Sequence, residues 1–126
     1  MAMELMEGNL RELIQNRKIT IDDALDIILQ IALALDYAHK DFNIVHRDIK
    51  PENILYKEET FKLSDWGLAG IQILLSHTSG YKGTLAYSAP EQLDATKGRI
   101  RPWTDVWQLG VVLYELITGG LPFGIT

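Results

Sequence analysis

Two long apolar segments, at residues 21–40 and 104–119, dominate the pattern of hydrophobic and polar positions. In the first segment, Asp22, Asp26 and Gln30 form one narrow polar stripe at helical spacing, and nearly all other positions are apolar. The second segment is also apolar on nearly every face. A helix of this kind is normally buried on most sides. Both segments are therefore predicted to be helices that lie deep within a larger protein body.

Capping signals mark the ends of both predicted helices. Thr20 is a favourable N-cap for the first helix, because its hydroxyl oxygen can accept from a free backbone N–H. Asp22 and Asp23 follow in the first turn, where the helix dipole favours negative charge. Thr104 is predicted to cap the second helix, and Gly119 is predicted to end it.

Shorter elements are predicted between these two helices. Residues 8–17 are predicted to form a short helix after a turn, and β-prone residues predict strands at 43–45, 54–56 and 61–64. Small and polar residues with weak periodicity, from 67 to about 89, indicate a long functional loop. The predicted fold class is mainly α with short β hairpins, in an α+β arrangement.

Composition and charge exclude several classes of protein. The 126 residues are 47% hydrophobic and 23% charged, which is typical of one small globular domain. The net charge of −5 and the lack of a basic block argue against nucleic-acid binding. Cysteine is absent from the sequence, so it forms neither disulfides nor thiolate metal sites. The sequence shows no signal peptide, and its longest apolar stretch is shorter than the roughly 20 residues of a membrane span, so a cytoplasmic protein is expected.

The stretch IVHRDIKPENILYKEETFKLSDWG, residues 44–67, contains the groups that phosphoryl transfer requires. This reaction needs a carboxylate to orient the attacking hydroxyl, a cation for the phosphates, and oxygen ligands for Mg²⁺. Asp48 is a candidate for the first role and Lys50 for the second. Asn53 and Asp65 supply an amide and a carboxylate oxygen for the metal.

The same residues resemble a known family. Residues 46–53, His-Arg-Asp-Ile-Lys-Pro-Glu-Asn, are similar to the catalytic-loop signature of eukaryotic-type protein kinases. Asp-Trp-Gly at 65–67 resembles the Asp-Phe-Gly metal motif, with Trp66 in the aromatic position. Ala-Pro-Glu at 89–91 resembles the end of an activation segment, and 105–123 resembles the central helix of the kinase C-lobe. The resemblance covers residues 1–126, with the motifs in family order.

This resemblance implies a part of a protein kinase C-lobe. It divides the chain into a hinge (1–8), helices with the catalytic loop (9–64), an activation segment (65–91) and the central helix region (92–126). The glycine-rich loop and strand lysine of the N-lobe, and the final C-lobe helices, are not in these 126 residues. The fragment alone is therefore expected to be inactive and to self-associate through its apolar helices.

The resemblance also implies roles for individual residues. It places Asp48, Lys50, Asn53 and Asp65 in catalysis, and the metal on Asn53 and Asp65. Asp105 is expected to tie the central helix to the catalytic loop, His46 to pack in the core, and His39 and His77 to face solvent. The implied ATP-binding residues are Glu4, Met6, Asn9, Lys50, Asn53, Leu55 and Asp65. The implied supporting residues are Arg47 and Thr84, and the implied phosphorylation sites are Thr78 and Ser79.

Three interpretations follow from these residues. The leading one is a serine/threonine kinase parent that uses ATP and Mg²⁺ to phosphorylate a protein substrate. Lys50 favours this branch over tyrosine kinases. The alternative is a kinase-like interaction or scaffold module without catalysis, which the departure at Trp66 and the shortness of the chain favour. A small-molecule kinase fits less well, because the Ala-Pro-Glu segment serves peptide substrates in the family.

Overall fold

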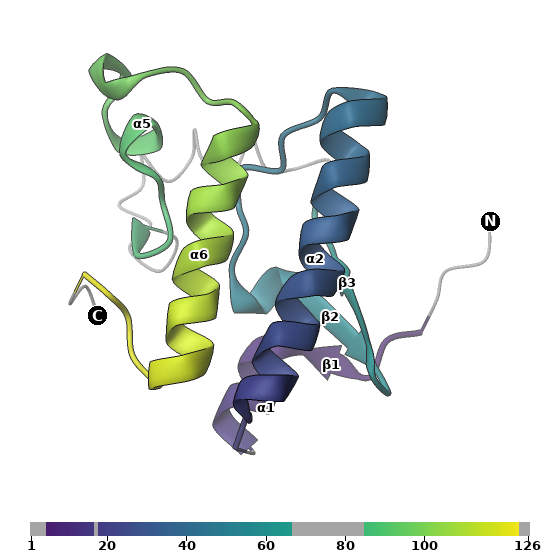
Figure 1. Cartoon of the computed structure of the whole chain (residues 1–126). Helices are drawn as coiled ribbons and strands as arrows, with labels where there is room; N and C mark the ends of the chain where they lie inside the picture. The colour runs from purple at the N-terminus through teal and green to yellow at the C-terminus, as the bar shows by residue number, and fades with distance from the viewer. Residues whose placement is uncertain (1–4, 17, 67–84, 124–126) are drawn as a thin grey trace.

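The computed structural model describes residues 5–16, 18–66 and 85–123. Two long helices, α2 and α6, lie side by side, and a small antiparallel sheet lies beside them near the N-terminal end of α2 (Figure 1). The predicted fold class, mainly α with a small β part, is confirmed. The helices are α1 (Leu10–Asn16), α2 (Ile21–Phe42), α5 (Pro90–Leu93) and α6 (Pro102–Thr118), with 3₁₀ turns η1 (Pro51–Asn53) and η2 (Ala95–Lys97). The strands are β1 (Gly8–Asn9), β2 (Ile54–Lys57) and β3 (Thr60–Leu63).

The sheet has the order β1-β2-β3, with both pairs antiparallel. β2 and β3 form a hairpin in register from Ile54 opposite Leu63 to Lys57 opposite Thr60, close to the predicted strands. β1 was not predicted, because two residues carry no periodic signal. The strand predicted at 43–45 is wrong: Asn43 adopts the left-handed conformation (φ 53°) and caps the C-terminus of α2. Its backbone N–H donates to the carbonyl of Ala38. This N–H therefore caps the helix and is not available for pairing with a strand.

α2 begins as the sequence predicts and buries one face. Thr20 Oγ1 accepts from the N–H of Asp23 (3.0 Å), and the Asp23 carboxylate accepts from the N–H of Thr20 (3.2 Å), which completes a capping box. The buried positions recur every three or four residues, as expected for one face of a helix packed on a core. They are Ala24, Ile27, Ile31, Leu35 and Ala38.

The opposite face of α2 is apolar but exposed. Its side chains recur every four residues and keep more than half of their surface accessible among the described ranges: Ile21, Leu25, Leu29, Leu33 and Tyr37. Within the described ranges, α6 and β3 cover only one side of α2. The burial of α2 in a larger protein body stays a prediction. In the same ranges, no helix is long and apolar enough to cross a bilayer.

α6 starts two residues earlier than predicted. Its N-cap is Arg101, with Pro102 at the first position, where the missing N–H of proline removes no hydrogen bond. Thr104 is therefore not the cap but the third helical residue. It is fully buried, accepts from the N–H of Arg101 (3.1 Å) and donates to Glu91 Oε2 (2.7 Å). α6 ends at Gly119 as predicted, with a left-handed φ of 80°.

Removal of the Thr104 hydroxyl tests this start of α6. Thr104→Val keeps the shape but leaves the Arg101 N–H and the Glu91 carboxylate without this partner, so we expect a loss of about 1–3 kcal/mol in the free energy of unfolding. Urea denaturation followed by tryptophan fluorescence measures it. Thr60→Val, at an exposed position of β3 whose hydroxyl forms no hydrogen bond within the described ranges, is the matched control and should change stability by less than about 0.5 kcal/mol. Equal losses in both variants would contradict the assignment.

Candidate active site

The loop at residues 43–50 connects α2 to η1, and side chains of α6 hold its backbone. Asp105 is fully buried. Its Oδ2 accepts from the N–H of His46 and its Oδ1 from the N–H of Arg47, both at 2.8 Å. A buried carboxylate is costly unless it is hydrogen-bonded, and here both oxygens are used. The predicted role of Asp105, tying the central helix to this loop, is confirmed.

Gln108, one turn further along α6, extends this anchor. Its Oε1 accepts from the N–H of Ile49 (2.9 Å), and its Nε2 donates to the carbonyl of Arg47 (3.0 Å). Gln92 of α5 also donates to that carbonyl (2.6 Å) and accepts from Gln108 (2.9 Å). Sequence reasoning missed both glutamines. The available signal was a glutamine inside an apolar helix, because such an amide needs buried partners.

The two histidines near Asp105 behave differently from each other. His39 was expected to face solvent, but its Nε2 lies 2.8 Å from Asp105 Oδ2 and its side chain is only 13% exposed. The reason is that α2 and α6 pack together, which the local sequence does not show. His77 lies outside the described residues. His46 is fully buried, as expected, with Nε2 2.6 Å from the carbonyl of Ser64.

Trp66, the departure from the family pattern, is accommodated. Its ring packs edge-on against the ring of His46, with centroids 4.8 Å apart, and it adjoins the hydrophobic core. Its indole N–H donates to the carbonyl of Leu63 (3.0 Å). A tryptophan here therefore fills an apolar slot and satisfies its one polar group.

Asp48, Lys50 and Asn53 come together at the end of the loop. The Asp48 residue is 1% exposed, and its Oδ2 accepts from Asn53 Nδ2 (3.1 Å) and lies 3.8 Å from Lys50 Nζ. Asn53 Nδ2 also donates to the Asp48 carbonyl (2.8 Å). Burial raises the pKa of Asp48 above its ordinary 3.8, against the opposing effects of the Lys50 charge and the Asn53 hydrogen bond. The three residues are thus arranged around one desolvated carboxylate.

Asp65 lies just after β3, next to a segment that is bonded to Asn53. Ser64 donates to the carbonyl of Asn53 from both its N–H (2.8 Å) and its hydroxyl (3.1 Å). Asp65 itself is exposed and holds a left-handed φ of 62°. Its charge contributes to the raised pKa of Asp48, so the two carboxylates are within electrostatic range.

These residues fit a magnesium ion in their chemistry. Both hydrogen bonds of Asn53 to Asp48 use Nδ2, so its Oδ1 remains available as a metal ligand. Asp65 adds an exposed carboxylate. Mg²⁺ is commonly bound through one or two carboxylates plus phosphate and water oxygens, so few protein ligands are needed. Among the described residues, no group of three or more His, Asp or Glu is arranged to hold a metal ion.

The implied nucleotide-binding residues are only partly described. Asn9 pairs with Leu55 across β1 and β2, so these two residues are neighbours. The Asn9 side chain caps α1 by accepting from the N–H of Glu12 (3.0 Å), and Leu55 and Met6 are partly buried. Other predicted site residues lie outside the described residues: Glu4, Thr78, Ser79 and Thr84.

A second polar network was missed by sequence reasoning. The Tyr87 residue is 3% exposed, and its hydroxyl donates to Glu115 and accepts from Arg11. Arg11 also pairs with Glu115 (3.0 Å) and with Glu52 (3.1 Å). Burial raises the pKa of Tyr87, together with its hydrogen bond to Glu115, so its hydroxyl keeps the proton that it donates. The network joins α1, α6 and the end of the predicted activation segment.

Comparison with known proteins gives a consistent result. Residues 1–126 match the family described as protein kinase domain. The chain is 47% identical over 98 residues to developmentally-regulated protein kinase 1 of Dictyostelium discoideum, covering 77% of this chain and 13% of that protein. It is 39% identical over 127 residues to a probable serine/threonine-protein kinase of Clostridium perfringens, covering 97% of this chain and 18% of that protein.

A third relative is serine/threonine-protein kinase A of Synechocystis, which is 37% identical over 136 residues, with 96% of this chain and 26% of that protein covered. The chain thus spans between 13% and 26% of the length of these three relatives. The family match extends over every residue of the chain and includes the loop that Asp105 and Gln108 hold. The chain therefore belongs to the protein kinase domain family.

Proposed function

We propose that the protein carrying these residues transfers the γ-phosphoryl group of ATP to serine or threonine hydroxyls of a protein substrate. The observation that supports this most is the Asp48 carboxylate, buried between the Lys50 ammonium group and the Asn53 amide. The relatives compared above include proteins named as serine/threonine kinases, which agrees with Lys50 at this position.

In the proposed reaction, an Asp48 oxygen accepts a hydrogen bond from the substrate hydroxyl and orients its oxygen toward the γ-phosphorus. The new O–P bond forms as the bond to the β–γ bridging oxygen breaks, ADP leaves, and the hydroxyl proton passes to Asp48. Lys50 balances negative charge on the transferred group. The raised pKa of Asp48 favours its role as proton acceptor, since its basicity increases in the desolvated site.

Nucleotide and metal binding are part of the same proposal. Asn53 and Asp65 hold Mg²⁺, which supplies charge neutralisation at the phosphates when it is bound. Glu4 and Met6 meet the adenine edge, Leu55 lies under the ring, and Asn9 lies near the ribose.

Arg47 is proposed as the partner of a phosphorylated activation segment. It holds a left-handed φ of 79° and is partly buried, and its guanidinium forms no ion pair within the described ranges. A guanidinium can bind a phosphate in bidentate fashion. Phosphate on Thr78 or Ser79 would thus order the segment, with Thr84 supporting Asp48 and Lys50.

A chimera tests the proposed activity. Residues 1–126 would replace the aligned segment of the Clostridium perfringens relative, which supplies the rest of a kinase. We expect transfer of labelled phosphate from ATP to a protein acceptor. Asp48→Asn should lower the rate by about 100-fold or more with ATP affinity nearly unchanged, because Asp48 faces the acceptor hydroxyl. Asp65→Asn should instead weaken Mg²⁺-dependent ATP binding.

The outcomes separate the proposal from its alternative. A chimera that melts cooperatively and binds ATP but transfers no phosphate would favour the kinase-like interaction module. Equal effects of Asp48→Asn and Asp65→Asn on ATP affinity would contradict the separate roles.

Burial of Asp48 also predicts a dependence of stability on pH. The pKa of Asp48 is higher in the folded chain than the 3.8 of the unfolded chain, so the unfolded chain loses this proton at a lower pH. The free energy of unfolding therefore falls as pH rises from 3.8 toward the folded pKa. Asn cannot ionise, so Asp48→Asn should be more stable than the parent at neutral pH. This advantage should disappear below the unfolded pKa. Thermal unfolding between acidic and neutral pH measures it.

Asp94→Asn is the matched control, because the pKa of Asp94 is shifted in the opposite direction to that of Asp48. Hydrogen bonds from Thr96 lower the pKa of the exposed Asp94 carboxyl, so it contributes stability above its unfolded pKa, and this contribution is lost as pH falls through the folded value. Asp94→Asn should therefore be the less stable protein at neutral pH. The same pH trend in both variants would contradict the assignment.

A further inference from the structure

The peptide plane that precedes Asp48 is hydrogen-bonded at both of its ends. At one end, the Arg47 carbonyl accepts from Gln92 Nε2 (2.6 Å) and from Gln108 Nε2 (3.0 Å). At the other end, the Asp48 N–H donates to His46 Nδ1 (3.1 Å). These bonds fix the orientation of the whole plane, because a peptide unit is planar.

The plane that follows Asp48 is fixed in the same way. The Asp48 carbonyl accepts from Asn53 Nδ2 (2.8 Å), and the Ile49 N–H donates to Gln108 Oε1 (2.9 Å). A residue has two soft backbone dihedrals, and both are set when the planes before and after it are fixed. The hydrogen bonds therefore determine the direction in which the Asp48 side chain leaves the backbone.

Gln108 bonds to both planes through a single amide group. It is fully buried; its Oε1 accepts from the plane after Asp48, and its Nε2 donates to the plane before it. Asp105, by contrast, bonds to the N–H groups of His46 and Arg47, which belong to planes that end before Asp48. Asp105 thus holds the loop, whereas Gln108 acts on the two sides of Asp48 itself.

Gln92 joins this arrangement to α5. The residue is 6% exposed, and its Oε1 accepts from the N–H of Ala89 (2.9 Å) and from Gln108 Nε2 (2.9 Å). These two donors direct its Nε2 toward the Arg47 carbonyl. Ala89 is the N-cap of α5, so one buried amide connects the start of this helix to the peptide plane before Asp48.

We propose that Gln108 is a positioning residue for Asp48, and that Gln92 makes this positioning depend on the placement of α5. The proposal rests on the proposed function, in which Asp48 orients the substrate hydroxyl. Orientation matters there because a misplacement on the order of 1 Å can lower a reaction rate by about 100-fold. The competing explanation is that both glutamines only stabilise the fold.

The first test is Gln108→Met in the natural polypeptide that contains residues 1–126, at a temperature where circular dichroism shows it folded. Methionine keeps the length of the side chain but forms neither amide bond. We expect the single-turnover rate of phosphoryl transfer at saturating substrates to fall by about 100-fold. The dissociation constant of ATP should stay within about twofold, because the lost contacts act on the acceptor side of the reaction.

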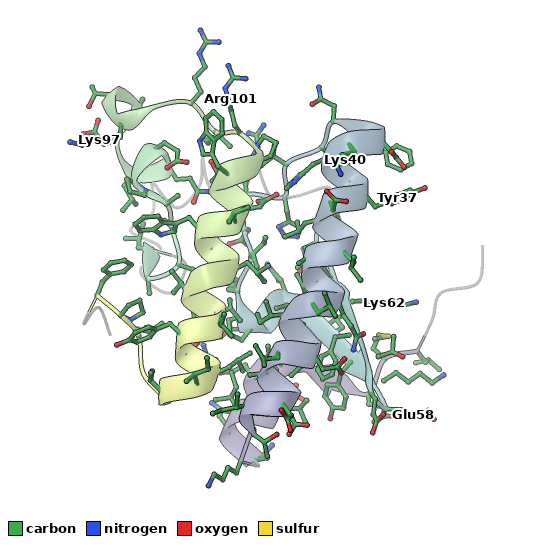
Figure 2. All side chains as sticks on the ribbon, in the orientation of Figure 1. Tyr37, Lys40, Glu58, Lys62, Lys97 and Arg101 are labelled. Carbon is green, nitrogen blue, oxygen red and sulfur yellow. The ribbon has the colours of Figure 1, made fainter. Side chains whose placement is uncertain are left out.

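Gln30→Met is the matched control, because it removes the same two kinds of backbone hydrogen bond elsewhere. Gln30 donates to the carbonyl of Glu59 (2.9 Å) and accepts from the N–H of Phe61 (2.9 Å). Figure 2 shows Glu58, at this hairpin turn, at the opposite edge of the molecule from Lys97, which follows α5. The control should change the transfer rate by less than about twofold, and an equal loss in both variants would overturn the positioning role.

Combination with Asp48→Asn separates positioning from stabilisation. A residue that acts through the Asp48 carboxylate has little effect once that carboxylate is gone. Gln108→Met should therefore lower the residual rate of Asp48→Asn by less than about threefold. An undiminished loss in this background would mean that Gln108 does not act through Asp48.

Gln92→Met tests the link to α5 and leaves the bonds of Gln108 to the loop in place, so it also serves if Gln108→Met does not fold. We expect a rate about tenfold lower than that of the parent, and this loss should also disappear in the Asp48→Asn background. Together with Gln108→Met it should cause little further loss, because both side chains act on the Arg47 carbonyl. Effects that simply multiply would overturn the link.

Hydrogen exchange at the Ile49 amide tests the arrangement without any activity. Gln108→Met should speed this exchange by about tenfold or more, because the N–H loses its acceptor, and Gln30→Met should not. Unchanged exchange would overturn the proposal. A parent polypeptide that folds and binds ATP but transfers no phosphate would contradict the proposed function, while exchange at Ile49 would still decide whether Gln108 holds the backbone around Asp48. Transfer that Gln108→Met leaves intact would contradict the positioning role alone.

Discussion

The Asp105 carboxylate is the interaction on which the rest of the structure depends. It is fully buried at the contact of α2 and α6, accepts from two consecutive N–H groups of the loop, and lies 2.8 Å from His39 Nε2. Loss of these partners would leave a buried charge uncompensated, which is among the most costly changes in a protein interior. The same contacts hold Arg47 in its left-handed conformation, which costs on the order of 1–3 kcal/mol and persists only where neighbouring contacts impose it.

The site next to this anchor holds a buried carboxylate that is unfavourable for stability when it is ionised. Asp48 is almost completely buried, with one lysine and one amide as its polar neighbours. Desolvation raises its pKa and makes the ionised form less favourable in the folded chain. A neutral residue would suit the fold better at this place, but it could not accept a proton. The proposed role of Asp48 as proton acceptor would account for a carboxylate at this buried position.

The sequence predicted features whose physical cause is local. The N-cap at Thr20, the hairpin strands and the end of α6 at Gly119 depend on neighbouring residues, and they were predicted correctly. The motif at 46–53 also allowed the grouping of Asp48, Lys50 and Asn53. The features that were missed join distant segments: His39 with Asp105, Gln92 with Gln108, and Arg11 with Tyr87 and Glu115. No local pattern indicates such partners, because packing between elements creates them. Gln30 was read as part of a polar stripe for the same reason, although it joins α2 to the hairpin.

The separation between the loop and its anchor has a consequence for protein synthesis. The α6 side chains that bond to the backbone of residues 46–49 lie 58 to 61 positions later in the chain. On the ribosome, the loop emerges well before Asp105 and Gln108, and contacts between such distant positions form late because the intervening chain must first be ordered. The nascent loop can therefore carry its complete motif without its final conformation. A ribosome that stopped before the codon for Asp105 would display residues 44–67 while the helix that holds this loop in its final conformation had not yet been made.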